Sequence, residues 1–140
     1  MAYCTLDDLK NLISETELAQ LTAESGEEPD PEVVAWAIAQ AGGEIDSYLA
    51  ERYRVPLSEV PSQVQALAAD MSIYHLYTRR SVAPRARRQK YEAAVAFLKE
   101  VIAGRAVLAG LEGELAQASR LAPEISSANR FFSRNGQKDW

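Results

Sequence analysis

The sequence predicts an all-α protein, a small helical bundle of about four to five helices with an extended C-terminal arm. Three observations predict this fold. Apolar residues recur at three- and four-residue spacing along most of residues 5–103, which is the period of helices that bury one face. Helix-capping residues or prolines stand ahead of several of these stretches. The chain has 140 residues, of which 47% are hydrophobic and 25% charged, as is typical of one globular domain.

The first two predicted helices are short. Thr5 and Asp8 have the spacing of a capping box, in which each residue bonds the backbone of the other, and Ser14 and Glu17 repeat this spacing. Apolar residues at helical spacing follow both pairs. Residues 24–30 are acidic and are interrupted by glycine and proline, so we expect a loop between these helices and the rest of the bundle.

A first long helix follows the acidic loop. Asp30 is placed to cap it, with Pro31 at its first position, and we expect it to end near Tyr53–Arg54. The pair Gly42–Gly43 in its middle costs a helix about 1–2 kcal/mol relative to alanine, so we expect a bend or a close helix crossing there. Residues 55–61 contain two prolines and are predicted to be a connecting loop.

Two more long helices are predicted. The second begins after Pro61, and its predicted inward face consists of Val64, Leu67, Ala68, Met71, Tyr74 and Thr78. The third begins at or near Pro84 and runs to about Ala103, where Gly104 is a plausible C-terminal cap. Apolar residues thin out beyond that glycine. We therefore divide the chain into a helical core, residues 1–110, and a C-terminal arm, residues 111–140.

Charge is distributed unevenly along the chain. Residues 1–60 hold 13 acidic and 3 basic residues, whereas residues 61–140 hold 7 acidic and 12 basic residues. A molecule that meets copies of itself front to back could use this asymmetry, because an acidic face attracts a basic one. The alternative is that both faces are simply solvated. The overall charge of −5 argues against a protein that coats DNA non-specifically.

Basic residues cluster at the joint between the second and third long helices. They are Arg79, Arg80, Arg85, Arg87, Arg88 and Lys90. Three interpretations are open: a phosphate site, a socket for acidic groups of a neighbouring subunit, or a solvated face whose first two arginines stabilise the end of their own helix. Arginine favours specific pairing, because its planar guanidinium group binds a carboxylate with two bonds. Arginines at a helix start oppose the helix dipole, which also favours a functional role.

Residues 126–140 combine three aromatic side chains with basic and polar ones. The candidate contact residues in this part of the arm are Arg130, Phe131, Phe132 and Arg134. Aromatic residues and arginine are enriched at protein interfaces, so we expect the arm to contact another protein. The alternative is a tail whose phenylalanines pack against the parent helices.

Residues suited to catalysis are few. His75 is the only histidine and Cys4 the only cysteine, and we expect His75 to be packed or hydrogen-bonded on its helix. No phosphate-binding glycine motif is present, and the adjacent carboxylates lack the spacing of a metal site. We therefore expect no enzymatic activity, no cofactor and no metal ion. No apolar run approaches the roughly 18 residues of a membrane span, so we expect no membrane partner.

Several strings of residues, taken in order, resemble a known family. They are Tyr3-Cys4-Thr5-Leu6-Asp7-Asp8-Leu9, Ile45-Asp46-Ser47-Tyr48-Leu49-Ala50-x-Arg52-Tyr53-x-Val55-Pro56-Leu57, Val60-Pro61, Asp70, Tyr74-x-Leu76-Tyr77-x-Arg79-Arg80 and Tyr91-x-x-Ala94-x-x-Phe97-Leu98. Over roughly residues 2–110 the chain resembles the Mu-like phage family of small head–tail connector proteins. The closing Arg130-Phe131-Phe132-Ser133-Arg134 is similar to the family's C-terminal signature. One departure is the strongly basic Arg85-x-Arg87-Arg88 after Pro84.

The resemblance implies an all-α connector that forms a homo-oligomeric ring of about twelve copies. The ring would lie in the virion neck, between the portal protein and the next neck or tail protein. Double-stranded DNA would pass through its lumen without sequence-specific binding. The chain would be in the host cytoplasm before assembly. The basic cluster and the arm would then form subunit or portal interfaces, and no enzymatic activity is implied.

An alternative from another functional class is a helix–turn–helix DNA-binding regulator that uses residues 79–90. The negative overall charge argues against it, as does the lack of a recognisable short turn followed by a recognition helix. An enzyme is a third and more distant alternative, because so few catalytic side chains are present.

Overall fold

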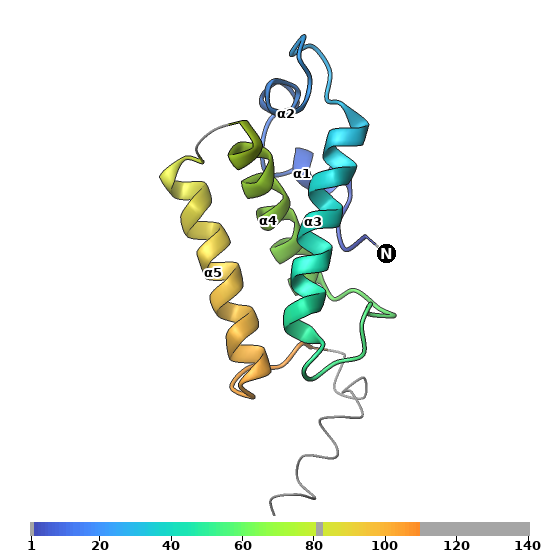
Figure 1. The fold of residues 1–140 in the computed structure, drawn as a ribbon, viewed down its shortest axis with the longest axis vertical. Helices are drawn as coiled ribbons and strands as arrows, with labels where there is room; N and C mark the ends of the chain where they lie inside the picture. Colours follow the sequence, from blue (N-terminus) through green and yellow to red (C-terminus); the bar gives the residue numbers. More distant parts are fainter. Residues whose placement is uncertain (1, 81–82, 110–140) are drawn as a thin grey trace, which may run out of the picture.

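Five α-helices make up most of the chain that the computed structural model describes, residues 2–80 and 83–109 (Figure 1). They are α1 (Leu6–Lys10), α2 (Glu15–Thr22), α3 (Pro31–Leu49), α4 (Ser62–Arg80) and α5 (Arg85–Ile102). The all-α bundle predicted from the sequence is confirmed. The predicted arm, residues 111–140, lies outside the described residues. No described helix has the length and apolar character needed to cross a membrane.

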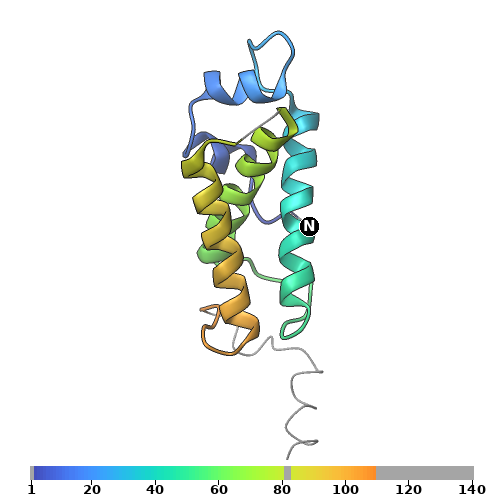
Figure 2. The ribbon, with the colours of Figure 1, turned by 60° about the vertical axis from the view of Figure 1, so that its left-hand side comes forward.

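The three long helices lie side by side, with α4 packed against both α3 and α5 (Figures 1 and 2). α4 and α5 run in opposite directions as a helical hairpin. α2 lies across one end of the long helices (Figure 2), and α1 packs against α3 and α4. Apolar burial between these elements is the main force that holds them together. The largest fully buried aliphatic side chains are Leu9, Leu18, Ile45, Leu49, Leu57, Met71, Ile73, Leu76, Leu98 and Leu108.

The central helix α4 is buried on more than one side. Its predicted inward face included Val64 and Met71, which are buried, and Thr78, which is exposed. Ile73 and Leu76 lie outside that predicted face and are also fully buried. The reason is that α4 contacts each of the other four helices, so a single apolar stripe does not describe its buried surface.

The helix starts follow the predicted capping chemistry. The N–H of Thr5 donates to Asp8 Oδ2 at 2.8 Å and the N–H of Asp8 donates to Thr5 Oγ1 at 3.3 Å, which completes the capping box of α1. Ser14 caps α2 by accepting from the N–H of Glu17 at 3.1 Å. Asp30 caps α3, with Pro31 at its first position. These bonds satisfy N–H groups that have no partner inside their own helix.

The end of α3 was predicted wrongly. The sequence predicted an end near Tyr53–Arg54, but the last helical residue is Leu49. The N–H groups of Arg52 and Tyr53 both donate to the carbonyl oxygen of Leu49, at 2.9 and 2.7 Å, so the chain turns there. The turn carries the side chain of Tyr53 into the core, where its hydroxyl accepts a bond from the N–H of Leu108 at 3.3 Å. A tertiary contact therefore ends this helix before its apolar pattern does.

Gly104 ends α5, as predicted. Its φ of +84° lies in the left-handed region that favours glycine. The N–H of Arg105 donates back to the carbonyl oxygen of Glu100 at 2.9 Å, which satisfies one of the last carbonyl groups of the helix.

We expect Gly104→Ala to lower the free energy of unfolding by about 1–2 kcal/mol, because a Cβ is strained in this backbone conformation. The added Cβ would also lie 2.7 Å from Arg52 Nη1, the far end of a flexible side chain. Gly43→Ala is the matched control: it lies within α3, and a Cβ there meets nothing within 4 Å. It should raise stability by about 0.5–1 kcal/mol. Urea denaturation followed by circular dichroism measures the free energy of unfolding of both variants. If both substitutions changed it in the same direction, the assignment of Gly104 as the left-handed residue that ends α5 would be contradicted.

Candidate interaction surfaces

The first two arginines of the basic cluster lie against α2. Arg79 Nη1 and Arg80 Nε donate to the carbonyl oxygen of Leu21 at 3.4 and 3.2 Å, and Arg80 Nη2 donates to that of Ala23 at 3.0 Å. These carbonyls lie at the C-terminal end of α2, where the last carbonyl groups lack partners within the helix and the dipole is negative. The two arginines therefore stabilise the end of α2 and fix it to the end of α4.

The other four bases form an exposed patch at the start of α5. We call Arg85, Arg87, Arg88 and Lys90 the α5 basic patch. Arg87 is half-buried and its Nη2 donates to the carbonyl oxygen of Leu12 at 3.4 Å, while the other three are exposed. The structure therefore divides the predicted cluster into a part that supports the fold and a part that faces outward.

A groove beside this patch carries an exposed leucine. The Leu12 groove has a volume of about 270 Å³ and lies between α1, α4 and α5; its lining residues are Asp8, Leu12, Ser62, Gln65, Ala66, Ala69, Asp70 and Lys90. The side chain of Leu12 is 43% exposed. Sequence reasoning missed this site, because Leu12 has the spacing of a core residue and its position after the end of α1 was not foreseen.

A second hollow carries an exposed tryptophan. The Trp36 hollow, about 280 Å³ in volume, is formed by the start of α3 and the end of α4; it is lined by Asp30, Glu32, Val33, Trp36 and Arg79. Trp36 is 43% exposed. Tryptophan and arginine dominate the binding energy of many protein interfaces. Sequence reasoning missed Trp36 as well, although a signal was present: it lies off the apolar stripe that includes Val34 and Ile38.

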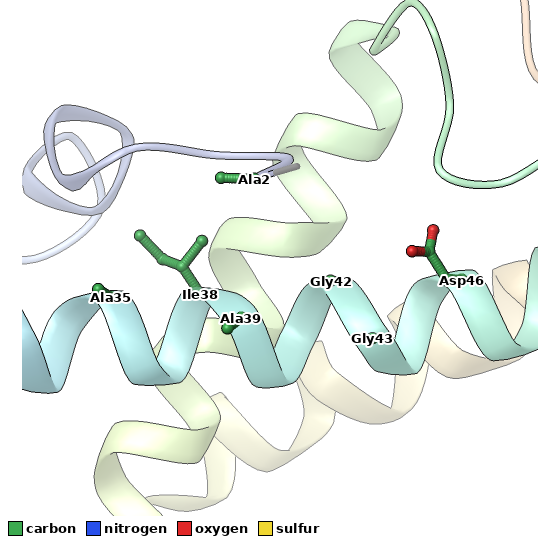
Figure 3. A pocket seen from close by; sticks show the side chains of 7 residues that line it. All are labelled: Ala2, Ala35, Ile38, Ala39, Gly42, Gly43 and Asp46. Carbon is green, nitrogen blue, oxygen red and sulfur yellow. The ribbon is translucent and has the colours of Figure 1, made fainter.

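A third hollow, of about 350 Å³, follows α3 beneath the N-terminal segment (Figure 3). Its lining is Ala2, Ala35, Ile38, Ala39, Gly42, Gly43 and Asp46. The helix α3 runs unbroken through the Gly42–Gly43 pair, and Ala2 lies over the same side of the helix. The small side chains leave room for the N-terminal segment to pass close to the helix.

Tyr3 fastens that N-terminal segment to the bundle. Its hydroxyl donates to Asp46 Oδ1 and accepts a bond from the N–H of Leu57 at 2.9 Å. Burial and the bond to the Asp46 carboxylate raise the pKa of Tyr3 to about 12, because both favour the neutral phenol. The polar groups at this hollow are therefore engaged in holding the fold together.

Three helices meet at the carboxylate of Glu44. The hydroxyl of Tyr91 on α5 donates to Glu44 Oε2, and His75 Nε2 on α4 lies 2.9 Å from Glu44 Oε1. Tyr74 stacks on Tyr91 with ring centroids 4.1 Å apart. As expected, His75 is hydrogen-bonded on its helix. Burial, followed by the bond to Glu44, raises the pKa of Tyr91 above its ordinary value, so the phenol stays a donor.

The described residues offer little for chemistry. Residues 2–80 and 83–109 hold no group of three or more His, Cys, Asp or Glu side chains arranged to bind a metal ion. Cys4 is buried, and burial raises the pKa of its thiol, which lowers its reactivity. The absence of enzymatic activity stays a prediction.

The predicted contact residues of the C-terminal arm, Arg130, Phe131, Phe132 and Arg134, lie outside the described residues.

The helix–turn–helix alternative gains no support from the angle between α4 and α5. Such motifs set two helices at about 90–120°, whereas α4 and α5 run side by side in opposite directions (Figures 1 and 2).

Comparison with known proteins identifies similar sequences. Residues 3–125 match the model of the family described as Bacteriophage Mu, Gp36. Over 109 residues the chain is 31% identical to the Mu-like prophage FluMu protein gp36 of Haemophilus influenzae; the match covers 78% of this chain and 76% of that protein. The residues matched to the family include all five described helices. Neither match supports a DNA-binding regulator.

We expect Tyr3→Phe to lower the free energy of unfolding by about 1–3 kcal/mol near neutral pH, because it removes the bond to Asp46 and leaves the N–H of Leu57 without its partner. The folded pKa of about 12 lies above the usual value of 10.0. The contribution of this tyrosine is therefore complete below about pH 10 and is lost as the pH rises toward about 12.

Urea denaturation of both proteins across this pH range checks the assignment. The difference in stability between wild type and Tyr3→Phe should shrink as the pH rises from about 10 to about 12. A difference that stays constant throughout would show that the Tyr3 phenol is not held in its neutral form by folding.

Proposed function

The chain belongs to the bacteriophage Mu Gp36 family, and on that premise we propose that it is a structural protein of the phage particle. In this proposal it is a head–tail connector that forms a ring between the portal protein and the next neck or tail protein. DNA passes through the ring without sequence-specific binding. The ring lies in the virion neck, and the chain resides in the host cytoplasm before assembly.

The arrangement of exposed groups is the observation that carries this proposal. Chemically versatile side chains such as His75, Tyr91 and Glu44 are bonded to one another between helices. By contrast, the outside of the bundle carries the α5 basic patch, Leu12 and Trp36. Large apolar side chains beside charged groups are features of protein interfaces. A rigid bundle with these surfaces is suited to assembly, and the proposal includes no enzymatic step and no cofactor.

The proposed mechanism is docking of preformed parts. The five helices supply a rigid wedge, and wedges that associate head to tail around an axis close into a ring. The arm, residues 111–140, contacts a neighbouring subunit or the portal through Arg130, Phe131, Phe132 and Arg134. The α5 basic patch binds acidic groups of the neighbouring protein, because guanidinium groups pair with carboxylates in a fixed geometry.

Electron microscopy of the purified chain with the portal protein of the same phage tests the connector role. We expect rings on the portal with the full chain. Deletion of residues 126–140 should leave the circular dichroism spectrum helical and abolish incorporation into particles, because the arm provides contacts outside the bundle. Normal incorporation of the shortened chain would remove the arm from the mechanism, and failure of the full chain to bind any particle component would remove the connector role.

Charge reversal in the α5 basic patch should weaken assembly. We expect Arg88→Glu to weaken association about tenfold at low salt, with a smaller effect at high salt, because salt screens exposed charges. Arg54→Glu is the matched control, since it makes the same charge change at an exposed position in the loop between α3 and α4. Analytical ultracentrifugation or particle incorporation measures both variants. If Arg88→Glu and Arg54→Glu weakened association equally, association would depend on the net charge of the chain and not on the α5 basic patch.

A further inference from the structure

We infer that the Trp36 hollow of one copy receives the Leu12 edge of the next copy. The Leu12 edge is Leu12 with its neighbours Arg87 and Lys90. This inference rests on the proposed ring and names the contact that builds it, a repeated contact between two different faces of the same chain. The contact buries an aromatic and an aliphatic side chain between oppositely charged groups.

The Trp36 hollow has the features of a receiving surface. It combines Trp36, a residue that is 43% exposed, with Val33, beside the carboxylates of Asp30 and Glu32. A large, half-exposed aromatic side chain gains most when a partner covers it, and interface hot spots are rich in tryptophan. A volume of about 280 Å³ is enough for an aliphatic side chain. The hollow is therefore apolar at its centre and mainly acidic at its rim.

The Leu12 edge has the complementary features. Leu12 is 43% exposed, and the exposed large hydrophobic side chains of the described residues are Leu12, Trp36 and Val107. Arg87 bonds the carbonyl oxygen of Leu12 at 3.4 Å, and Lys90 lines the same groove, so two cations flank the leucine. Leu12 thus lies beside two basic side chains, whereas Trp36 lies beside two carboxylates. The carboxylates of Asp8 on α1 and Asp70 on α4 line the same groove as Leu12.

Each face also carries charges of the other sign. The Trp36 hollow contains one basic side chain, Arg79, and the Leu12 groove contains Asp8 and Asp70. Docking can therefore set Arg87 and Lys90 against Asp30 and Glu32, and Arg79 against a carboxylate of the groove. Such matching sets the orientation of an interface and suppresses alternative pairings.

The two faces lie on nearly opposite sides of α4. Asp70 lines the Leu12 groove and Arg79 lines the Trp36 hollow. These residues are two and a half helical turns apart at about 3.6 residues per turn, so they project in opposite directions. A contact between different faces on opposite sides is heterologous: it repeats from copy to copy and closes into a ring when the rotation allows. A second copy is favoured as the occupant, because this chain itself supplies both halves of the contact.

Cysteine cross-linking tests the contact directly. The chain carrying Asn11→Cys and Glu32→Cys, two exposed positions beside the contact that leave Leu12 and Trp36 in place, is assembled with the portal protein and then mildly oxidised. We expect a ladder of covalent multimers on a non-reducing gel, because each copy is joined to two neighbours. The native Cys4 is buried, with a raised pKa, and stays unreacted. The matched control is Asn11→Cys with Val107→Cys, which places the second cysteine at an exposed position away from the Trp36 hollow and should give no ladder.

The outcomes separate this contact from the ring itself. A ladder with the first pair only supports the contact. Rings that are visible by electron microscopy but give no ladder overturn the contact and leave the connector role standing. A ladder with both pairs indicates random collision and also overturns it. If the unaltered chain forms no ring with any particle protein, the proposed function is overturned, and this inference with it.

A charge exchange gives an independent measurement. Glu32→Arg should weaken ring formation about tenfold, and adding Arg87→Glu to the same chain should restore most of it, because every contact then pairs the two reversed charges. A loss that arises only from a weaker α3 start would not be restored by a change on α5. Failure of rescue in a variant that folds normally would overturn the pairing of these two faces.

Discussion

Burial of α4 from several sides is the constraint on which the rest of the structure depends. Its contacts with α1, α2, α3 and α5 bring the N-terminal half of the chain and the helical hairpin into one body. Even the polar Ser72 is buried there and donates to the carbonyl oxygen of Ala68 at 2.7 Å. Because α4 contacts the other four helices, it fixes their positions relative to one another, and with them the positions of the exposed residues Leu12 and Trp36.

Tyrosine–carboxylate bonds join the elements around that centre. Tyr91 bonds Glu44 between α5 and α3, and Tyr77 bonds Glu17 between α4 and α2. Together with the bond from Tyr3 to α3, these contacts use tyrosines that belong to the strings of residues resembling the Mu-like phage family. A buried phenol that donates to a carboxylate is costly to replace, because its removal leaves a charged acceptor without a partner. The motif residues thus describe how the bundle is held together.

Local chemistry was predictable from the sequence, and tertiary geometry was not. The caps at Thr5 and Asp30 and the terminator at Gly104 depend on residues within a few positions of each other, so their patterns are sufficient. The end of α3 depends on Tyr53 meeting the segment after α5, which no local pattern contains. The roles of Arg79 and Arg80 were hidden for the same reason: the carbonyls that they bind are almost 60 residues away.

The uneven charge of the chain is not neutralised within the described fold. Among residues 2–80 and 83–109 the ion pairs are Lys10–Glu15 and Arg105–Glu100, and His75 bonds Glu44; none of these contacts involves the α5 basic patch. Exposed ion pairs contribute only about 0–1 kcal/mol each, so these cations would mainly steer and orient a partner. Affinity has to come from burial of apolar surface, at about 25 cal/mol per Å². In the proposed ring, the charges of the α5 basic patch would therefore select the facing surface, and burial of Leu12 and Trp36 would supply the binding affinity.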